Sequence, residues 1–95
     1  MAAYVIVNTN VHNPTAYEAY KAQAKPLVEQ FGGKYLARGG AHKVIEGDWH
    51  PTRIVLLEFP TVAQAEKFFN SPEYAPVKAI RHANAHTDAV IVEGA

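Results

Sequence analysis

The sequence predicts an α+β domain in which two β-α-β units follow one another and their strands form one antiparallel sheet. Two observations carry this prediction. Each of two amphipathic helical segments lies between apolar, strand-like segments, and the halves on either side of Gly47 have similar lengths. The order β-α-β-β-α-β is the ferredoxin-like pattern. With 95 residues, the chain is expected to form one domain over residues 1–95.

The first half is predicted to begin with a strand over about residues 3–9 and to continue with a helix. Asn13 and Pro14 predict the helix start, because an Asn side chain caps backbone N–H groups and a first-turn proline costs no hydrogen bond. Apolar residues at steps of three and four form one stripe along this helix. They are Tyr17, Tyr20, Ala24, Leu27, Val28 and Phe31.

Prolines and glycines predict where these elements bend or end. Pro26 lies inside the helical pattern and is expected to kink the helix or to split its last turns. Gly32-Gly33 predicts the helix end, and a second strand follows over Lys34–Arg38. Gly39-Gly40 predicts a bulge or bend, after which the strand is expected to resume through His42–Glu46.

The second half is predicted to repeat this arrangement. A turn over Gly47–Pro51 leads to the strongest strand pattern, Thr52–Phe59. The run Thr61–Gln64 predicts a helix start, because Thr and Gln side chains can cap backbone N–H groups reciprocally. Ser71-Pro72 predicts that a helix restarts there, and a last strand is expected over about Thr87–Glu93.

Both faces of the predicted strands are apolar. In the first strand, Tyr4 and Ile6 point to one face and Val5 and Val7 to the other, and the strand over residues 52–59 has the same two-sided pattern. The helices suffice to cover one face only, and each apolar side chain left in water forfeits roughly 1.5–3 kcal/mol. We therefore expect two copies to pack sheet against sheet as a homodimeric α/β barrel. Charging that second face, for example by Val55→Asp, is expected to dissociate or unfold the protein.

The composition excludes several classes of protein. Nine basic and nine acidic residues give a net charge of zero, which argues against nucleic-acid binding. The chain has no cysteine, so it has no disulfide or thiolate site, and this is compatible with the cytoplasmic location that we expect. The N-terminus lacks the pattern of a signal peptide. No segment approaches the roughly 20 apolar residues that would cross a membrane.

Several segments read together resemble the domain-of-unknown-function 1330 family. They are Tyr35–Gly40, EGDWHPTRIVLLEFP at Glu46–Pro60, NSPEY at Asn70–Tyr74, and Ile80-Arg81. The resemblance covers nearly the whole chain. It implies the fold of the dimeric α/β barrel proteins, which include cofactor-free monooxygenases, muconolactone-type isomerases and stress-responsive proteins, but it implies no established reaction. Relatives often have a Trp-Tyr type pair where this chain has Phe68-Phe69.

Two arginines are candidates for binding a carboxylate ligand. Arg38 lies at the end of one predicted strand and Arg53 at the start of the next. A guanidinium group binds a carboxylate through two parallel hydrogen bonds. The alternative is that both arginines form structural ion pairs, for example with Glu46 or Glu58.

Two residues are candidates for proton transfer. Glu58 shares a strand face with apolar residues, where burial would disfavour its charged form, as suits a general acid or base. The alternative is a structural pair with Arg81 or a tyrosine. His42, which flanks the turn together with His50, can move protons near neutral pH, although a histidine in a loop is more often merely solvated.

The remaining candidates have structural alternatives as well. Trp49 either covers a pocket or anchors the dimer. Tyr74 and Arg81 are predicted to bind ligand, although helix capping also explains the run that contains Tyr74. His82 and His86 have the spacing of metal ligands on a helix, but we expect the helix to end between them and therefore no metal site.

The sequence is interpreted as that of a homodimer that binds a small molecule in a pocket between its sheet and its helices. If the protein is an enzyme, we expect proton transfer or oxygenation of a small acid or aromatic compound without a cofactor. The alternative is a non-catalytic, stress-related or interaction module whose polar residues are structural.

Overall fold

The computed structural model describes residues 1–95 and contains four strands and three helices. In chain order the elements are β1 (Ala3–Val11), α1 (Pro14–Gln30), β2 (Lys34–Arg38), β3 (Ile54–Phe59), α2 (Val62–Phe69), α3 (Ala75–Asn84) and β4 (Ala85–Glu93). The strands form one antiparallel sheet in the order β2-β3-β1-β4. This arrangement confirms the predicted ferredoxin-like α+β fold.

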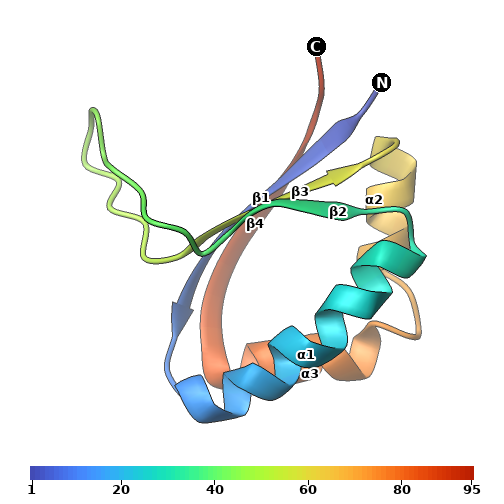
Figure 1. The fold of residues 1–95 in the computed structure, drawn as a ribbon, viewed down its shortest axis with the longest axis horizontal. Helices are drawn as coiled ribbons and strands as arrows, with labels where there is room; N and C mark the ends of the chain where they lie inside the picture. The colour runs from blue at the N-terminus through green and yellow to red at the C-terminus, as the bar shows by residue number, and fades with distance from the viewer.

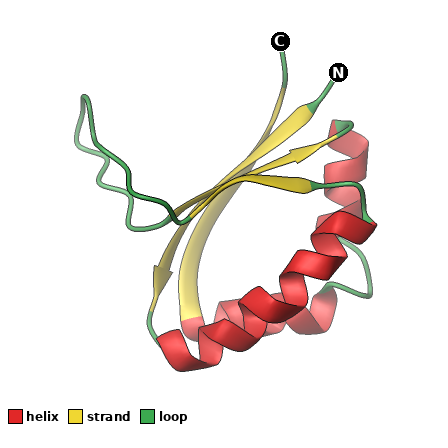
Figure 2. Ribbon diagram, in the orientation of Figure 1, coloured by secondary structure: helices red, strands yellow, loops and turns green.

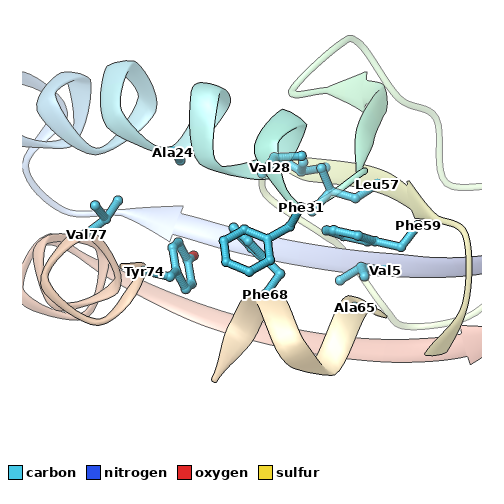
Figure 3. Packing of buried hydrophobic residues seen from close by; sticks show 11 residues of the cluster. Val5, Ala24, Val28, Phe31, Leu57, Phe59, Ala65, Phe68, Tyr74 and Val77 are labelled. Carbon is cyan, nitrogen blue, oxygen red and sulfur yellow. The ribbon is translucent and has the colours of Figure 1, made fainter. Parts of the chain in front are cut away.

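All three helices pack on one face of the sheet (Figure 1). Eleven buried apolar residues fill the space between the two layers, and aromatic rings from four segments meet among them (Figure 3). The ring centroids of Phe68 and Tyr74 are 4.3 Å apart, and those of Phe68 and Phe59 are 5.6 Å apart. Val55 belongs to this core with 8% of its surface exposed. Our assignment of Val55 to the second face was therefore wrong, because the strand alternation places it under the helices.

The opposite side of the sheet, here called the outer face, has no cover. The register aligns apolar side chains across three strands of this face. They are Tyr4, Ile6, Ile54, Leu56, Val90 and Val92. Val90 and Val92 keep 54% and 46% of their surface exposed. The expected second apolar face is therefore present and open in the single chain.

Capping side chains fix the helix starts, largely as predicted. The Asn13 side chain accepts a hydrogen bond from the N–H of Ala16 at 3.2 Å, and the Thr61 hydroxyl accepts one from the N–H of Gln64 at 3.0 Å. The reciprocal half of the expected capping box is missing, because the Gln64 side chain instead donates to the carbonyl of Phe31. It thereby connects α2 to the end of α1.

Two predictions about the helices need correction. The first helix continues through Pro26 to Gln30, so the proline does not split it. The last helix begins at Ala75 rather than at Pro72, after a turn. Ser71 nevertheless caps that turn, because its hydroxyl accepts a hydrogen bond from the N–H of Tyr74 and donates one to the carbonyl of Phe68.

The segment between β2 and β3 differs most from the prediction. No strand resumes over His42–Glu46; residues 41–50 form a loop in which every residue is exposed. This exposed loop extends away from the sheet (Figure 2). The β-bulge lies between Tyr35 and Ala37 instead of at Gly39-Gly40. The last strand also begins two residues earlier than expected, at Ala85.

Candidate functional site

A narrow cavity lies between the helices and the covered face of the sheet. Its volume is about 40 Å³, which is room for about three water molecules. Eleven of its 16 lining residues are hydrophobic. Six of the lining residues are aromatic: Tyr17, Tyr20, Tyr35, Phe68, Phe69 and Tyr74. The site therefore has the apolar walls that are usual for small-molecule pockets.

Four cationic side chains also line the cavity, and no acidic residue does. The cations are Lys21, Arg38, Arg53 and Arg81. The three ion pairs of the structure join Lys21 to Glu18, Lys34 to Glu58 and His86 to Asp88, so none of the three arginines has a carboxylate partner. The predicted ion pairs of Arg38 or Arg53 with Glu46 or Glu58 are not formed.

Aromatic rings and one backbone carbonyl hold the guanidinium groups in place. Arg38 lies over the ring of Tyr35 at 4.4 Å and donates a hydrogen bond of 2.8 Å to the backbone carbonyl of Lys21. Arg81, with 8% of its surface exposed, lies 6.0 Å from the ring centroid of Tyr20. Cation–π contacts of this kind contribute roughly 0.5–2 kcal/mol, which only partly compensates a buried charge.

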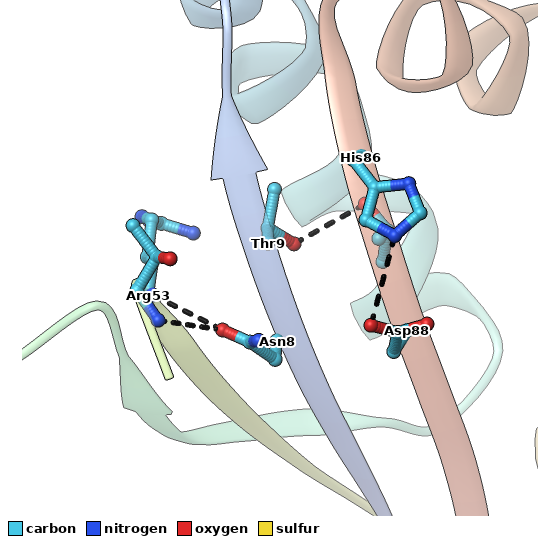
Figure 4. Close-up of polar contacts among 7 residues, drawn as sticks. Asn8, Thr9, Arg53, His86 and Asp88 are labelled. Carbon is cyan, nitrogen blue, oxygen red and sulfur yellow. Dashed lines mark hydrogen bonds and ion pairs between the residues drawn. The ribbon is translucent and has the colours of Figure 1, made fainter. Parts of the chain in front are cut away.

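The backbone conformation of Gly39 and the side chain of Asn8 together set the position of Arg53. Gly39 has a φ of +73°, and a Cβ atom there would lie 2.6 Å from Nε of Arg53, so only glycine leaves room for the guanidinium. On the neighbouring strand, the Asn8 side chain accepts hydrogen bonds from the N–H groups of Thr52 and Arg53 (Figure 4). These contacts fix the start of β3 against β1. The ring of Tyr17 lies 5.8 Å from the guanidinium carbon.

Two tyrosines of the cavity, Tyr20 and Tyr35, have raised pKa values. Tyr20 and Tyr74 share a hydrogen bond of 2.7 Å between their hydroxyl groups. Burial raises the pKa of Tyr20 far above its ordinary value of 10.0, and the adjacent Tyr74 adds to this rise. Burial also raises the pKa of Tyr35, against the opposing effect of Arg38. In the Tyr20–Tyr74 pair, one hydroxyl donates its proton to the hydrogen bond with the other. The accepting hydroxyl can therefore donate its own proton to another group.

Four of the predicted site residues meet at this cavity: Arg38, Arg53, Tyr74 and Arg81. Arg38 ends β2, Arg53 directly precedes β3, and Tyr74 and Arg81 lie at the N-cap and in the last turn of α3, so the fold joins residues that are distant in sequence. Tyr74 is buried and shares its hydroxyl hydrogen bond with Tyr20, as a residue facing a pocket between helix and sheet would.

The other predicted site residues lie elsewhere. Glu58 is on the outer face, where its carboxylate lies 3.5 Å from the ammonium group of Lys34, so the suggested pair with Arg81 is wrong. His42 lies in the exposed loop, and its role in proton transfer stays a prediction, as does that of Glu58. Trp49, 59% exposed, lines a shallow hollow on the outer face with Ile6 and Val90.

Sequence reasoning missed the contribution of α1 to the site. Tyr17 and Tyr20 were assigned only to the apolar stripe of the helix, and Lys21 was not among the candidate site residues, yet all three line the cavity. A signal was present in the residue types. A stripe that only fills a core favours Phe or Leu, whereas buried tyrosine hydroxyls need polar partners.

Two negative findings concern the described chain as a whole. Nowhere do three or more His, Asp or Glu side chains gather in a way that could hold a metal ion. The helix ends at Asn84, which separates His82 from His86 as expected. No helix has the length and hydrophobicity required to cross a membrane.

Solved structures with the same fold include proteins of known and unknown function. A protein of unknown function from Rhodopseudomonas palustris, RPA0582, is 20% identical, with a TM-score of 0.79 over 99% of this chain and 82% of that one. SnoaB, a cofactor-independent oxygenase from Streptomyces nogalater, is 9% identical, with a TM-score of 0.70 over 99% and 93%. A dimeric ferredoxin-like protein of unknown function from Jannaschia is 13% identical, with a TM-score of 0.71 over 99% and 100%.

These similarities show the fold, and the comparison of sequences shows the family. No curated protein matches the chain. The family model for a domain of unknown function, DUF1330, matches residues 2–95. The match covers nearly the whole chain and includes the four predicted residues that meet at the cavity. The chain therefore belongs to the DUF1330 family.

Proposed function

We propose that this protein is a homodimer that binds a small acid or aromatic molecule in the cavity between its helices and its sheet. One observation carries the proposal: three guanidinium groups converge on a largely aromatic cavity in which no carboxylate neutralises them. Unpaired buried charges are costly, and proteins usually pair them. An anionic ligand would supply the missing partner.

The reaction that such a site favours is one in which negative charge develops on an oxygen of the ligand. Fixed guanidinium and tyrosine hydroxyl donors stabilise such an oxyanion without reorganising. Proton transfer and cofactor-free oxygenation both pass through anions of this kind. SnoaB, which is a cofactor-independent oxygenase, has the same fold, and we extend this chemistry to the present chain by analogy only.

The outer face supports the homodimer. Its apolar side chains span β1, β3 and β4 without a cover, and a second copy of the same face would offer an equally apolar surface to cover them. The exposed loop adds Ile45, 92% exposed, and Trp49 to the apolar surface of the monomer. The dimeric ferredoxin-like protein from Jannaschia shows that the fold occurs in dimers. In the proposed dimer, the sheets pack face to face and the cavities lie on the outside.

A thermal-shift comparison of matched ligands tests the proposal. Benzoate and benzamide have similar shapes, but only benzoate is an anion. At about 100 times its dissociation constant, a ligand stabilises the native state by roughly 2.7 kcal/mol, which is a visible shift in Tm. We expect benzoate or a related aromatic acid to raise Tm and its amide not to do so.

Variants locate the binding site. Arg81→Gln should remove most of the shift, whereas Lys25→Gln, which removes an exposed cation of α1, should retain it. Equal shifts with acid and amide, or a shift that Arg81→Gln leaves unchanged, would contradict the proposal.

A non-catalytic binding module is the second candidate, and the lining of the cavity favours it. No Asp, Glu or His contributes to the cavity wall, so no ordinary general base is at hand. The two candidates differ in one readout. A ligand that binds and is converted, as followed by oxygen consumption or by loss of the ligand, identifies an enzyme, and a ligand that binds and persists identifies the module.

A further inference from the structure

The polar side chains around the cavity differ from those of most sites for acid–base chemistry. Each titratable group that faces it is a cation or a neutral phenol. Helix α1 contributes Tyr17, Tyr20 and Lys21, β2 contributes Tyr35 and Arg38, and the remaining groups are Arg53, Tyr74 and Arg81. None of the side-chain types that ordinarily accept a proton near neutral pH is among them. The cavity can donate hydrogen bonds to an anion, but it cannot take a proton from a neutral acid.

We infer that the cavity binds its ligand as a preformed aromatic oxyanion, a phenolate or enolate, and that the protein stabilises this anion without a side-chain base. This inference rests on the proposed function and names its ligand class. The aromatic part follows from the six rings in the wall, against which a flat ring packs well. Lining side chains must move apart to admit such a ring, because the space of about 40 Å³ is smaller than the cavity of about 150 Å³ that holds a benzene molecule. The oxyanion follows from the three guanidinium groups that have no carboxylate partner.

Arg81 and the tyrosine pair lie together in the wall of the cavity, and the ligand oxygen should lie beside them. The guanidinium of Arg81 lies 6.0 Å from the ring centroid of Tyr20, and Tyr20 shares its hydroxyl hydrogen bond with Tyr74. The pair can offer one free O–H to an incoming oxyanion. A charged donor next to a neutral donor, in a wall rich in aromatic rings, distinguishes a phenolate from a neutral ring of the same shape.

The proton balance of binding is simple. The O–H bond of the ligand breaks, its electron pair stays on the ligand oxygen, and the proton passes to water or buffer. The cavity favours the anion because nearby opposite charges lower the pKa of a bound acid by about one to three units. This corresponds to a preference of about 10- to 1,000-fold for phenolate over phenol.

A chromophoric phenol makes this preference measurable. The probe is 4-nitrophenol, whose phenolate absorbs at a longer wavelength than the phenol, and 4-nitroanisole is the matched compound that cannot ionise. We would titrate each probe with the dimeric protein at several pH values and follow absorbance. In the presence of saturating protein, the ionisation curve of nitrophenol should move at least one pH unit lower, and nitroanisole should bind at least tenfold more weakly.

Variants and a proton count complete the test. Arg81→Gln should return the ionisation curve toward that of free nitrophenol, Arg81→Lys should retain part of the shift, and Lys25→Gln should retain all of it. Calorimetry in buffers of different ionisation enthalpy should show release of one proton when nitrophenol binds below its free pKa.

The outcomes separate the two proposals. If nitrophenol binds with an unchanged ionisation curve, or nitroanisole binds equally well, the inference is wrong while the proposed binding function stands. If neither probe nor any aromatic acid binds to the cavity, both are wrong.

Discussion

At the scale of single residues, the most informative side chain is Arg81. It is buried, it lies at the cavity, and it has no carboxylate partner. From the sequence, Arg81 was predicted to bind ligand, with a structural pair to Glu58 as the alternative. The two residues lie apart, because Glu58 is on the outer face and Arg81 is on a helix of the opposite layer. Alternation along β3 decides this, since residue 58 points away from the core residues 57 and 59.

Replacement of Arg81 by Met should stabilise the unliganded protein. When an apolar side chain of similar length replaces an unpaired buried charge, we expect the free energy of unfolding to rise by about 1–4 kcal/mol. Urea denaturation measures the change, with the exposed Lys25→Met as the control. A large destabilisation by Arg81→Met alone would mean that Arg81 is a structural residue and would weaken the case for an anion site.

The buried tyrosines predict a dependence of stability on high pH. Burial raises the pKa of Tyr20 in the folded protein above its ordinary value of 10.0. Its stabilising contribution is therefore complete below pH 10, and it is lost above pH 10 because only the unfolded chain then ionises. The loss is about 1.4 kcal/mol per pH unit for each such group. Chemical denaturation between pH 9 and 11 measures this loss. The free energy of unfolding should fall less steeply with pH in Tyr20→Phe than in the wild type. An equally steep fall in the variant would show that Tyr20 does not carry the effect.

At the scale of elements, the helix and strand starts follow local chemistry more closely than the connections do. Asn13 and Thr61 cap the helices that they were predicted to cap. Part of the loop over residues 41–50 was predicted as a resumed strand, His42–Glu46, and this segment contains the β-branched residues Val44 and Ile45. It has no strand partner in the monomer, and β propensity alone does not hold an extended segment in a sheet.

Pro26 lies inside a continuous helix and should cost stability there. Proline lacks the N–H that would donate to the carbonyl four residues earlier, and its ring crowds that carbonyl. We expect Pro26→Ala to raise the free energy of unfolding by about 1–3 kcal/mol, as measured by chemical denaturation. Pro76 is the matched control, because it lies in the first turn of α3, where no such hydrogen bond is lost. Equal effects of the two substitutions would contradict this explanation.

At the scale of the whole molecule, the proposed dimer depends on the uncovered outer face. One layer of helices leaves the other side of the sheet open, and the apolar residues on that side are the same ones whose pattern suggested a dimer. Val55 was the wrong residue with which to test this face, because it lies in the core. Val90, which is 54% exposed and pairs with Ile6 across the strands, is the appropriate one.

Val90→Asp should dissociate the dimer without unfolding the chain. A carboxylate buried without a partner costs about 3 kcal/mol or more, which weakens association by about a hundredfold. Light scattering at micromolar concentration should show a shift from dimer to monomer, with Ala63→Asp on the exposed side of α2 as the control. A wild-type protein that is monomeric, or a Val90→Asp variant as dimeric as wild type, would remove sheet packing as the mode of assembly.

The sequence by itself determined the element order, the two-sided strands, most helix caps and the family, because these depend on local spacing and on side-chain alternation. Only the tertiary structure decided which arginines share a cavity, that Glu58 and His42 lie away from it, and that α1 tyrosines belong to it. The physical reason is distance along the chain. Lys21, Arg53 and Arg81 meet only after three elements pack, and no local pattern encodes which side chains then remain unpaired.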